Sequence, residues 1–399
     1  MSLDTKPNIS QTSTSSGEQL LALTPNFAKR RQLALQSARK VSDKIDALIV
    51  SDHHDIHYLT GVHEGIFWLV LSDQGAMGIS RHMLLAEVRS VAPDCEILLP
   101  TTLSTESAQM ERFLMTEAAK RGLNNCAIDS SRLSASSYLL LAQHATAAGV
   151  TLQALPNLLA GLRAVKDESE IALTRRCVAI AEAALAELIS GGASKLIGRT
   201  ERDIVNQLDA RMRALGADRQ AFPGTDIIVA SGPNSASAHH TSGQRRIAAG
   251  EALLIDWGAE LSSYRSDSTR TLFIGELPDF AVKAYPVVQE ALDRAANAVR
   301  AGASMGEIDK LARETVTSAG YEEFHYGVGH GVGLEIHEAP WLRSRSTEFL
   351  QTNMLTTIEP GIYLPGIGGI RLEKIYRVTD SGHETLGTLT TNLEDMIIS

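Results

Sequence analysis

"ALLIDWGAELSSYRSDSTRTLFIG", residues 252 to 275, consists of two apolar and β-branched runs on either side of a short polar segment. This pattern predicts two antiparallel strands joined by a turn. Paired positions in an antiparallel hairpin have a constant sum, so a turn centred between Leu261 and Ser262 places Asp256 opposite Asp267. Both acids would then lie on one face of the sheet, with β-carbons about 5 Å apart.

A second predicted hairpin, "TIEPGIYLPGIGGIRLEKIYRV" at residues 357 to 378, repeats this arrangement. A turn centred at Gly366 pairs Glu359 with Glu373. Acids close to turns are usually solvated surface groups, but the apolar runs before Asp256 and Glu359 predict burial. A buried, unpaired carboxylate is very costly, and like charges placed opposite one another destabilise a sheet. Two such pairs therefore need protons or a bound cation.

The stretch "GVGHGVGLEIHEAP", residues 327 to 340, adds His330 and His337 within a run of glycines. It fits a phosphate-binding loop poorly, because its spacing matches neither known glycine motif and because Glu335 and Glu338 would lie beside the anion. Glycines also allow a backbone to pass close to a metal or a substrate, since they have no β-carbon. We therefore expect these glycines to serve a metal site.

A third cluster, "ASGPNSASAHHTSG" at residues 230 to 243, places His239 and His240 in a loop of small residues. From the local sequence alone, the two histidines fit an exposed polar turn as well as a functional site. Four carboxylates and an imidazole form an oxygen-rich site, which favours manganese, cobalt, zinc or iron over a metal selected by thiolates. Two such ions about 3.5 to 4 Å apart lower the pKa of water from 15.7 to about 7, which indicates hydrolysis.

The length of 399 residues exceeds that of one ordinary hydrophobic core and predicts two domains. Residues 18 to 162 alternate short strands with helices, which is typical of an α/β domain. Residues 163 to 399 combine long helices with antiparallel hairpins, which is typical of an α+β domain. We place the boundary near Arg163 and expect residues 1 to 17 to form a disordered tail. The best-defined predictions are strands at 46 to 52, 67 to 73 and 126 to 130, and helices at 106 to 122, 170 to 189, 200 to 216 and 304 to 320.

The bulk composition limits the partners that the chain can have. A formal charge of −10 argues against binding to nucleic acid or to anionic lipid. The longest apolar run, residues 65 to 71, is far shorter than the roughly 20 residues of a membrane span. No secretory signal is recognisable, and Cys95, Cys126 and Cys177 form no C-x-x-C pair. We therefore expect structural thiols and a cytoplasmic location.

Several motifs, taken together, resemble a known family. "SGPNSASAHH", "DWGAELSSYRSDSTRT", "GVGHGVGLEIHEAP", "TIEPGIYLPG" and "GGIRLEK" occur in the order found in the pita-bread metallopeptidases, which include methionine aminopeptidase, aminopeptidase P and prolidase. This resemblance covers residues 163 to 399. "DALIVSDHHDIHYLTGV", residues 46 to 62, is similar to the creatinase-type N-terminal domain that aminopeptidase P and prolidase carry. The resemblance implies an α/β creatinase-like N-terminal domain and an α+β pita-bread catalytic domain.

The resemblance also implies roles for individual residues. The expected ligands of two divalent metal ions, with manganese favoured over cobalt, zinc or iron, are Asp256, Asp267, His330, Glu359 and Glu373. Glu359 also falls on the proton-shuttling carboxylate of the family. His239 and His337 match histidines that contact substrate and stabilise the tetrahedral intermediate. Arg371 matches the arginine two residues before the last ligand, where it can orient a ligand from outside the metal's own shell.

Three positions depart from the family pattern. Ala238 replaces the proline that usually precedes the first histidine, and Lys374 replaces an acid after the last ligand. Trp341 stands where some prolidases place an arginine that binds the carboxylate of a dipeptide. Arg343 or Arg345 could take over that role.

By resemblance, the chain is expected to be a cytoplasmic, homodimeric metallopeptidase that cleaves small peptides before proline, as an Xaa-Pro dipeptidase or aminopeptidase. One alternative is a creatinase-like C–N hydrolase on the same scaffold, whose metal-free chemistry would not need the five ligands. Another is a non-catalytic binding protein, but such relatives usually lose ligands and none is lost here. The metal content of the purified protein separates the first alternative from the peptidase.

Overall fold

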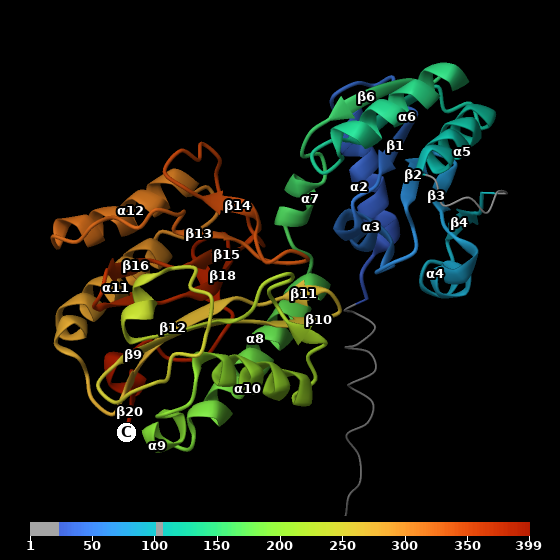
Figure 1. The fold of residues 1–399 in the computed structure, drawn as a ribbon. Helices are drawn as coiled ribbons and strands as arrows, with labels where there is room; N and C mark the ends of the chain where they lie inside the picture. The colour runs from blue at the N-terminus through green and yellow to red at the C-terminus, as the bar shows by residue number, and fades with distance from the viewer. Residues whose placement is uncertain (1–23, 101–106) are drawn as a thin grey trace, which may run out of the picture.

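The computed structural model describes residues 24–100 and 107–399 and contains two domains joined by the short helix α7 (Ala160–Ala164), as Figure 1 shows. The tail predicted for residues 1 to 17 lies outside the described residues. Among the helices in the described part of the chain, none has the length and apolar character needed to cross a bilayer.

The N-terminal domain is built on one mixed sheet of six strands. The strand order is β4-β3-β2-β1-β5-β6, and β1 pairs in parallel with β5 but antiparallel with β2. Side chains alternate between the two faces of the sheet. The bounds of the strands are β1 Ala47–Val50, β2 Trp68–Ser72, β3 Gly75–Ile79, β4 Cys95–Leu98, β5 Asn125–Asp129 and β6 Thr151–Leu155.

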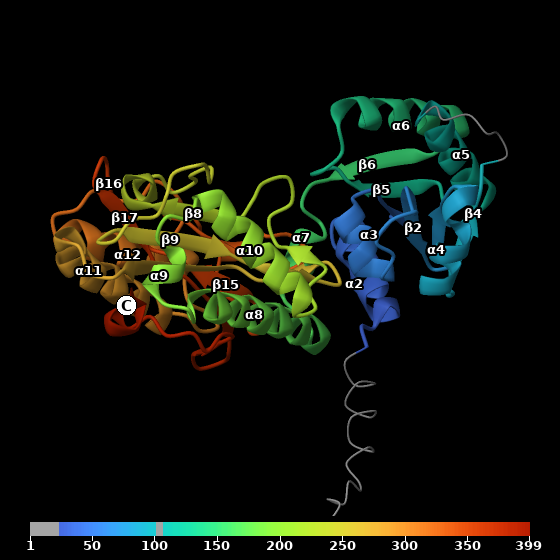
Figure 2. The same cartoon turned by 60° about the horizontal axis from the view of Figure 1, so that its bottom comes forward.

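Helices cover both faces of this sheet (Figure 2). On one face, α2 (Phe27–Arg39), α3 (His53–Thr60) and α4 (Leu85–Val91) share a hydrophobic cluster with Leu48 and Val50 of β1. The short 3₁₀ helix His82–Leu84 precedes α4. On the other face, α5 (Ser107–Lys120) and α6 (Ala135–Ala148) pack against Ala47 and Ile49. The predicted α/β layering is confirmed, with β1, β2 and β5 at the three expected strand positions.

The C-terminal domain combines antiparallel strands with long helices (Figure 1). One sheet has the order β20-β12-β9-β8, with smaller sheets β11-β10-β7, β13-β14, β15-β18-β19 and β16-β17. The bounds are β7 Arg219–Gln220, β8 Ile228–Ser231, β9 Ala252–Trp257, β10 Ala259–Leu261, β11 Tyr264–Arg265, β12 Ser268–Ile274, β13 Gly329–Gly331, β14 Glu338–Leu342, β15 Leu355–Ile358, β16 Gly361–Leu364, β17 Gly368–Arg371, β18 Lys374–Val378, β19 His383–Thr385 and β20 Ile397–Ile398.

The helices of this domain pack with the strands around one core. They are α8 (Glu168–Ile189), α9 (Ala193–Leu196), α10 (Glu201–Ala214), α11 (Asp279–Asn297) and α12 (Met305–Ser318), with 3₁₀ helices at Gly232–Ala236 and Leu393–Met396. The predicted helices correspond to α8, α10 and α12. Thr200 and Asp203 form a reciprocal capping box that starts α10 at Glu201. The helix α11 was not among the predictions; it contains Pro286, which normally interrupts a helix.

The register predicted for the first hairpin is wrong by two positions. Asp256 pairs with Thr269 rather than with Asp267. The turn is centred between Ser262 and Ser263, whose φ angles of 50° and 68° are those of a two-residue hairpin turn with the right twist for its strands. Serine is uncommon in that conformation, so the sequence did not reveal it. Asp267 is therefore a diagonal neighbour of Asp256 on the same face.

The register predicted for the second hairpin is confirmed. Gly361 pairs with Arg371 and Ile358 pairs with Lys374, and both pairs continue the register that places Glu359 opposite Glu373. The two acids interrupt the ladder between these pairs. The N–H of Glu359 donates to Val328 and that of Glu373 donates to Thr269, so each acid is anchored to a different neighbouring segment.

Gly258, between β9 and β10, provides a test of this strand packing. A β-carbon at position 258 would lie 1.9 Å from the carbonyl oxygen of Ser266. We expect G258A to lower the free energy of unfolding by about 1–3 kcal/mol or more, because the backbone cannot yield without breaking the hairpin. G161A is the matched control, since a β-carbon there meets open space within α7. Urea unfolding followed by circular dichroism measures both; equal midpoints for G258A and the wild type would contradict the close approach.

Candidate metal centre

A cavity of about 500 Å³ in the C-terminal domain gathers all the residues that the sequence predicted for the site. Its walls come from β8, from the loop that follows β8 and from the two acidic hairpins. The predicted site residues that line it are His239, Asp256, Asp267, His330, His337, Glu359, Arg371 and Glu373, and His240 lines it as well. Residues separated by more than 130 positions in the chain therefore face one space.

The four carboxylates are placed by the ends of strands. Asp256 is in β9 and Asp267 lies just before β12, and both are buried. Glu359 follows β15, and Glu373 follows β17 and is 1% exposed. Groups of ligand atoms that lie within 4.8 Å of one another include Asp256, Asp267 and Glu373, and separately His330, Glu359 and Glu373.

Three of these acids have oxygens without a hydrogen-bond partner in the described part of the chain: Asp256 Oδ1, Asp267 Oδ1 and Glu373 Oε1. Burial raises the pKa of all three carboxyls, and the charges of the neighbouring acids raise that of Asp267 further. Without a cation this cluster would take up protons, whereas a divalent ion would reverse the shift. The donor set therefore fits divalent metal ions.

The ring of His330 also faces this group of carboxylates. Its Nδ1 lies 3.0 Å from the carbonyl oxygen of Gly331 and must carry the proton, because a carbonyl can only accept. In the neutral ring, Nε2 then presents a lone pair to Glu359 Oε1 at 3.1 Å and to Asp267 Oδ2 at 3.7 Å. Burial alone would lower the pKa of His330, but the hydrogen bond and charge of Glu359 raise it. Either a proton or a metal ion must separate these lone pairs.

The other histidines differ in their surroundings. His337 is exposed to the cavity and its ring lies edge-on to that of His330, with centroids 4.4 Å apart. The pKa of His337 is lowered to about 4, first because its ring is partly removed from bulk water and then because His330 is close. His240 bonds through Nε2 to Glu201 of α10 at 2.9 Å, whereas His239 is exposed to the cavity. Nε2 of His240 is thus held by Glu201, whereas no such ion pair holds His239.

Arg371 contacts one of the predicted ligands directly and a second through a neighbour. It shares a strand face with Glu373, but its Nη2 donates to Asp256 Oδ2 at 2.6 Å. It reaches Glu373 only through Thr269, whose hydroxyl accepts from Arg371 Nε at 3.1 Å and donates to Glu373 at 2.8 Å. Arg371 Nη1 also donates to the hydroxyl of Tyr363 at 2.8 Å.

Sequence reasoning missed Thr269, Tyr326 and Tyr363. The two tyrosine hydroxyls lie 2.7 Å apart, and that of Tyr326 donates to the carbonyl of Glu359 at 3.3 Å. Thr269 could have been found from the correct register, since it pairs with Asp256. The tyrosines carry no spacing signal that would have revealed them.

Of the departures from the family pattern, Ala238 lines the cavity, whereas Trp341 and Lys374 are not among the described residues that line it. Arg343 stacks over the ring of Trp341 at 4.1 Å, and neither residue, nor Arg345, is among the described residues that line the cavity. Lys374 pairs with Ile358, and its pKa is lowered by burial and by Arg270. The carbonyl of Ala238 accepts a hydrogen bond from Arg371.

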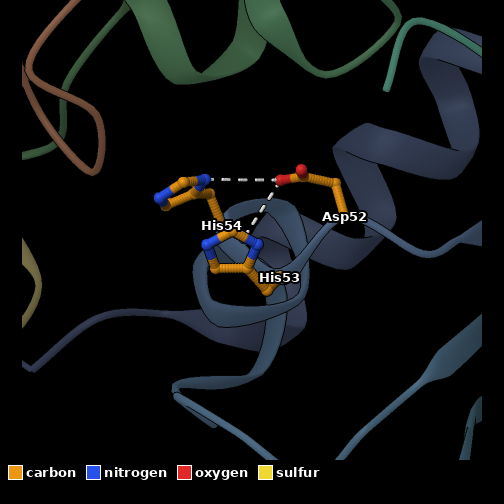
Figure 3. A group of neighbouring side chains, drawn as sticks. All are labelled: Asp52, His53 and His54. Atoms are coloured by element: carbon orange, nitrogen blue, oxygen red, sulfur yellow. Dashed lines mark hydrogen bonds and ion pairs between the residues drawn. The ribbon is translucent and has the colours of Figure 1, made fainter. Parts of the chain in front are cut away.

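A second group of potential ligands, Asp52, His53 and His54, lies at the start of α3 (Figure 3). Asp52 Oδ1 caps the helix by accepting the N–H groups of His54 and Asp55. The positive end of the helix opposes a cation there. The pKa of His54 is lowered to about 3 by burial, by His53 and by the charge of Arg163, which opposes a cation as well. Capping explains this cluster better than metal binding does.

Comparison with known proteins agrees with the chemistry of the cavity. Residues 172–380 match the model of metallopeptidase family M24, and residues 31–165 match the creatinase/prolidase N-terminal domain. The chain belongs to metallopeptidase family M24. Membership implies divalent metal ions, and it confirms the predicted pairing of a creatinase-like domain with a pita-bread catalytic domain.

Named relatives in this family include Xaa-Pro dipeptidases. That of Pyrococcus furiosus is 37% identical over 226 residues, which cover 56% of this chain and 63% of the relative. The chain thus matches the first relatives over less than two thirds of their length. The Xaa-Pro dipeptidase of Pyrococcus horikoshii is 29% identical, and the match covers 86% of this chain and 93% of that relative. The solved Xaa-Pro dipeptidase of Bacillus anthracis superposes with a TM-score of 0.84 at 31% identity, covering 92% of this chain and all of that one. The solved X-Pro aminopeptidase of Thermotoga maritima superposes with a TM-score of 0.80 at 29% identity, and the match covers 91% of this chain and 99% of that one.

Thr269 provides a test of how the M24 site is supported. We expect T269V to weaken the binding of Mn²⁺ about 10- to 100-fold, because Glu373 and Arg371 both lose the hydroxyl that holds them. T269S keeps the hydroxyl and is the matched control. Titration calorimetry of metal-free protein with Mn²⁺ measures the difference. Equal affinities for the two variants would show that Thr269 does not support the site.

Proposed function

We propose that this chain hydrolyses the peptide bond before proline, as an Xaa-Pro dipeptidase or aminopeptidase that uses two divalent ions. The observation that carries the proposal is the cluster of four carboxylates and His330, in which Nε2 of His330 faces Glu359 and Asp267. Three carboxylate oxygens in this cluster have no hydrogen-bond partner among the described residues. Bound cations compensate such a cluster without the protons that it would otherwise take up. The names of the relatives support the choice of substrate.

In this proposal Asp256, Asp267, His330, Glu359 and Glu373 hold the ions. Bound divalent ions supply Lewis-acid chemistry, which makes water a nucleophile near neutral pH and polarises a carbonyl. The surrounding residues place these ligands. Arg371 and Thr269 fix the orientation of Asp256 and Glu373, and Gly331 fixes the tautomer of His330.

The proton steps are assigned to the side chains that face the cavity. Glu359, partly exposed to the cavity, accepts the proton of the attacking water and passes it to the leaving nitrogen. His337, whose pKa of about 4 keeps it neutral at pH 7, donates a hydrogen bond to the developing oxyanion. His239 takes the same role from the opposite loop or orients the substrate carbonyl.

We further propose manganese as the working metal, a cytoplasmic location and a homodimer. Oxygen-rich ligands support manganese, and the three buried, free thiols support a reducing compartment. The metal-free C–N hydrolase is disfavoured because such chemistry would leave the carboxylate cluster uncompensated. A non-catalytic protein would have no need for the complete set of five ligands.

Removal of one ligand provides the direct test. We expect kcat/KM to fall at least about 1,000-fold in D267A and in H330A, and each variant to bind less metal. Activation of the water and polarisation of the carbonyl both depend on the bound ions. H325A is the matched control, because His325 is exposed just outside the glycine stretch. Hydrolysis assays and elemental analysis of each purified variant decide the outcome. Full activity in either ligand variant would overturn the assignment.

The length of the substrate is tested with Mn²⁺-loaded enzyme. Among the described lining residues, Arg371 is the only arginine or lysine, and Asp256, Thr269 and Tyr363 already occupy it. A dipeptide carboxylate would therefore find no unpaired arginine or lysine among the described residues that line the cavity. We expect faster release of the first residue from Xaa-Pro-Yaa than of proline from Xaa-Pro. Cleavage of neither peptide would contradict the proposed function.

A further inference from the structure

The segment that carries His337 is anchored outside the catalytic cavity. Leu334, three residues earlier, is 1% exposed and belongs to a hydrophobic cluster made mainly of residues from α2, α3, β1 and β2 of the N-terminal domain. The backbone of Gly333 accepts a hydrogen bond from the N–H of Arg265 at 2.9 Å. The stretch between β13 and β14 therefore contacts both domains, with His337 on the side of the cavity.

The residue after His337 is held by a buried ionic network. Glu338 Oε1 accepts from Lys166 Nζ at 2.6 Å, and its Oε2 accepts from Arg163 Nη2 and from the N–H of Glu335. Burial alone would raise the pKa of Glu338, but Lys166 and Arg163 hold it at about 2. Glu338 is therefore ionised at all working pH values, and both of its oxygens are fixed.

Arg163 connects this network to the N-terminal domain. It lies in α7, is 4% exposed, and donates from Nη1 to Asp55 Oδ1 at 2.8 Å and from Nη2 to Glu335 Oε2 at 2.8 Å. One guanidinium thus joins α3 to the acids on both sides of His337. Its planar, forked donors suit three carboxylates in a way that an ammonium could not.

The N-terminal side of the connection is itself fixed. Asp52 caps α3, as the close-up in Figure 3 shows, and so places Asp55 in the first turn, where it meets Arg163. Arg132, which follows β5, donates to Glu335 Oε2 at 2.6 Å. Asp55 is 5% exposed, whereas the side chain of Arg132 is 44% exposed. The buried contact through Arg163 is therefore the stronger link.

We propose that the N-terminal domain positions His337 through the chain Asp55–Arg163–Glu338, so that this domain takes part in catalysis without touching the substrate. Asp55 and Arg163 are positioning residues in this arrangement. The proposal rests on the proposed function, because it assigns His337 to the transition state of that reaction. Metal binding is unaffected, since no member of the chain holds an ion.

The kinetic test compares D55N and R163M with the wild type. We expect kcat to fall about 10- to 100-fold with KM and metal content nearly unchanged, because a displacement of about 1 Å costs this much. R163K keeps the charge and should recover part of the loss. R39M is the matched control, since Arg39 forms an exposed pair with Asp73 in the same domain. A loss of metal, or equal losses in R39M, would overturn the proposal.

A double-mutant cycle separates positioning from a general loss of structure. If Arg163 acts through His337, R163M should lower kcat in the wild-type background and have little further effect in H337A. Multiplied effects of the two substitutions on kcat would overturn the proposal. D55N and H337A form a second cycle, which remains available if R163M does not fold.

Hydrogen exchange gives a result that does not depend on activity. We expect amides of residues 329–342 to exchange at least about threefold faster in D55N and R163M than in the wild type or R39M, at equal metal content. Unchanged exchange would overturn the positioning role. The two proposals can fail separately. If the wild type cleaves no proline peptide but the variants still exchange faster than it does, the proposed function is rejected and the coupling between the domains stands.

Discussion

The structure of the catalytic domain depends on one electrostatic constraint, the gathering of four carboxylates, three of them buried, around one cavity. Asp256 stays in the ladder of β9, whereas Glu359 and Glu373 leave theirs, and their N–H groups bond to Val328 and Thr269 of other segments. Arg371 compensates part of the charge on Asp256, and Thr269 fixes one oxygen of Glu373. The negative charge that remains attracts cations, and without them it would destabilise the folded domain.

The glycines around His330 follow from the same constraint. A β-carbon at Gly329 would lie 1.9 Å from the carbonyl oxygen of Thr357, and one at Gly331 would lie 2.1 Å from that of Ala339. The strand β13 is therefore pressed between two other segments, and this brings the imidazole of His330 within reach of acids from both hairpins. Any larger residue would separate the strands and leave the carboxylates without their nitrogen partner.

The sequence predicted the chemistry of the site better than its geometry. Residue type and burial pattern were enough to single out the acids, because a buried carboxylate has few explanations, whereas the roles of the histidines came from the family resemblance. The register of the second hairpin was also correct, since Gly366 marks its turn. The first register was wrong because two serines adopt left-handed conformations that no local preference indicates. Thr269, Tyr363 and Arg163 were not foreseen as supports, because their roles come from contacts between residues far apart in the chain.

The predicted domain boundary near Arg163 has a physical meaning that composition could not show. Arg163 has partners on both sides of it: Asp55 before the boundary, Glu335 and Glu338 after it. The carboxylate cluster is internal to the catalytic domain, whereas the segment bearing His337 is held by both domains. The capacity to bind metal and the capacity to turn over substrate therefore depend on different parts of the chain. A change in how the N-terminal domain packs can alter catalysis while the ligand set stays complete, so a full set of ligands is necessary for activity but does not ensure it.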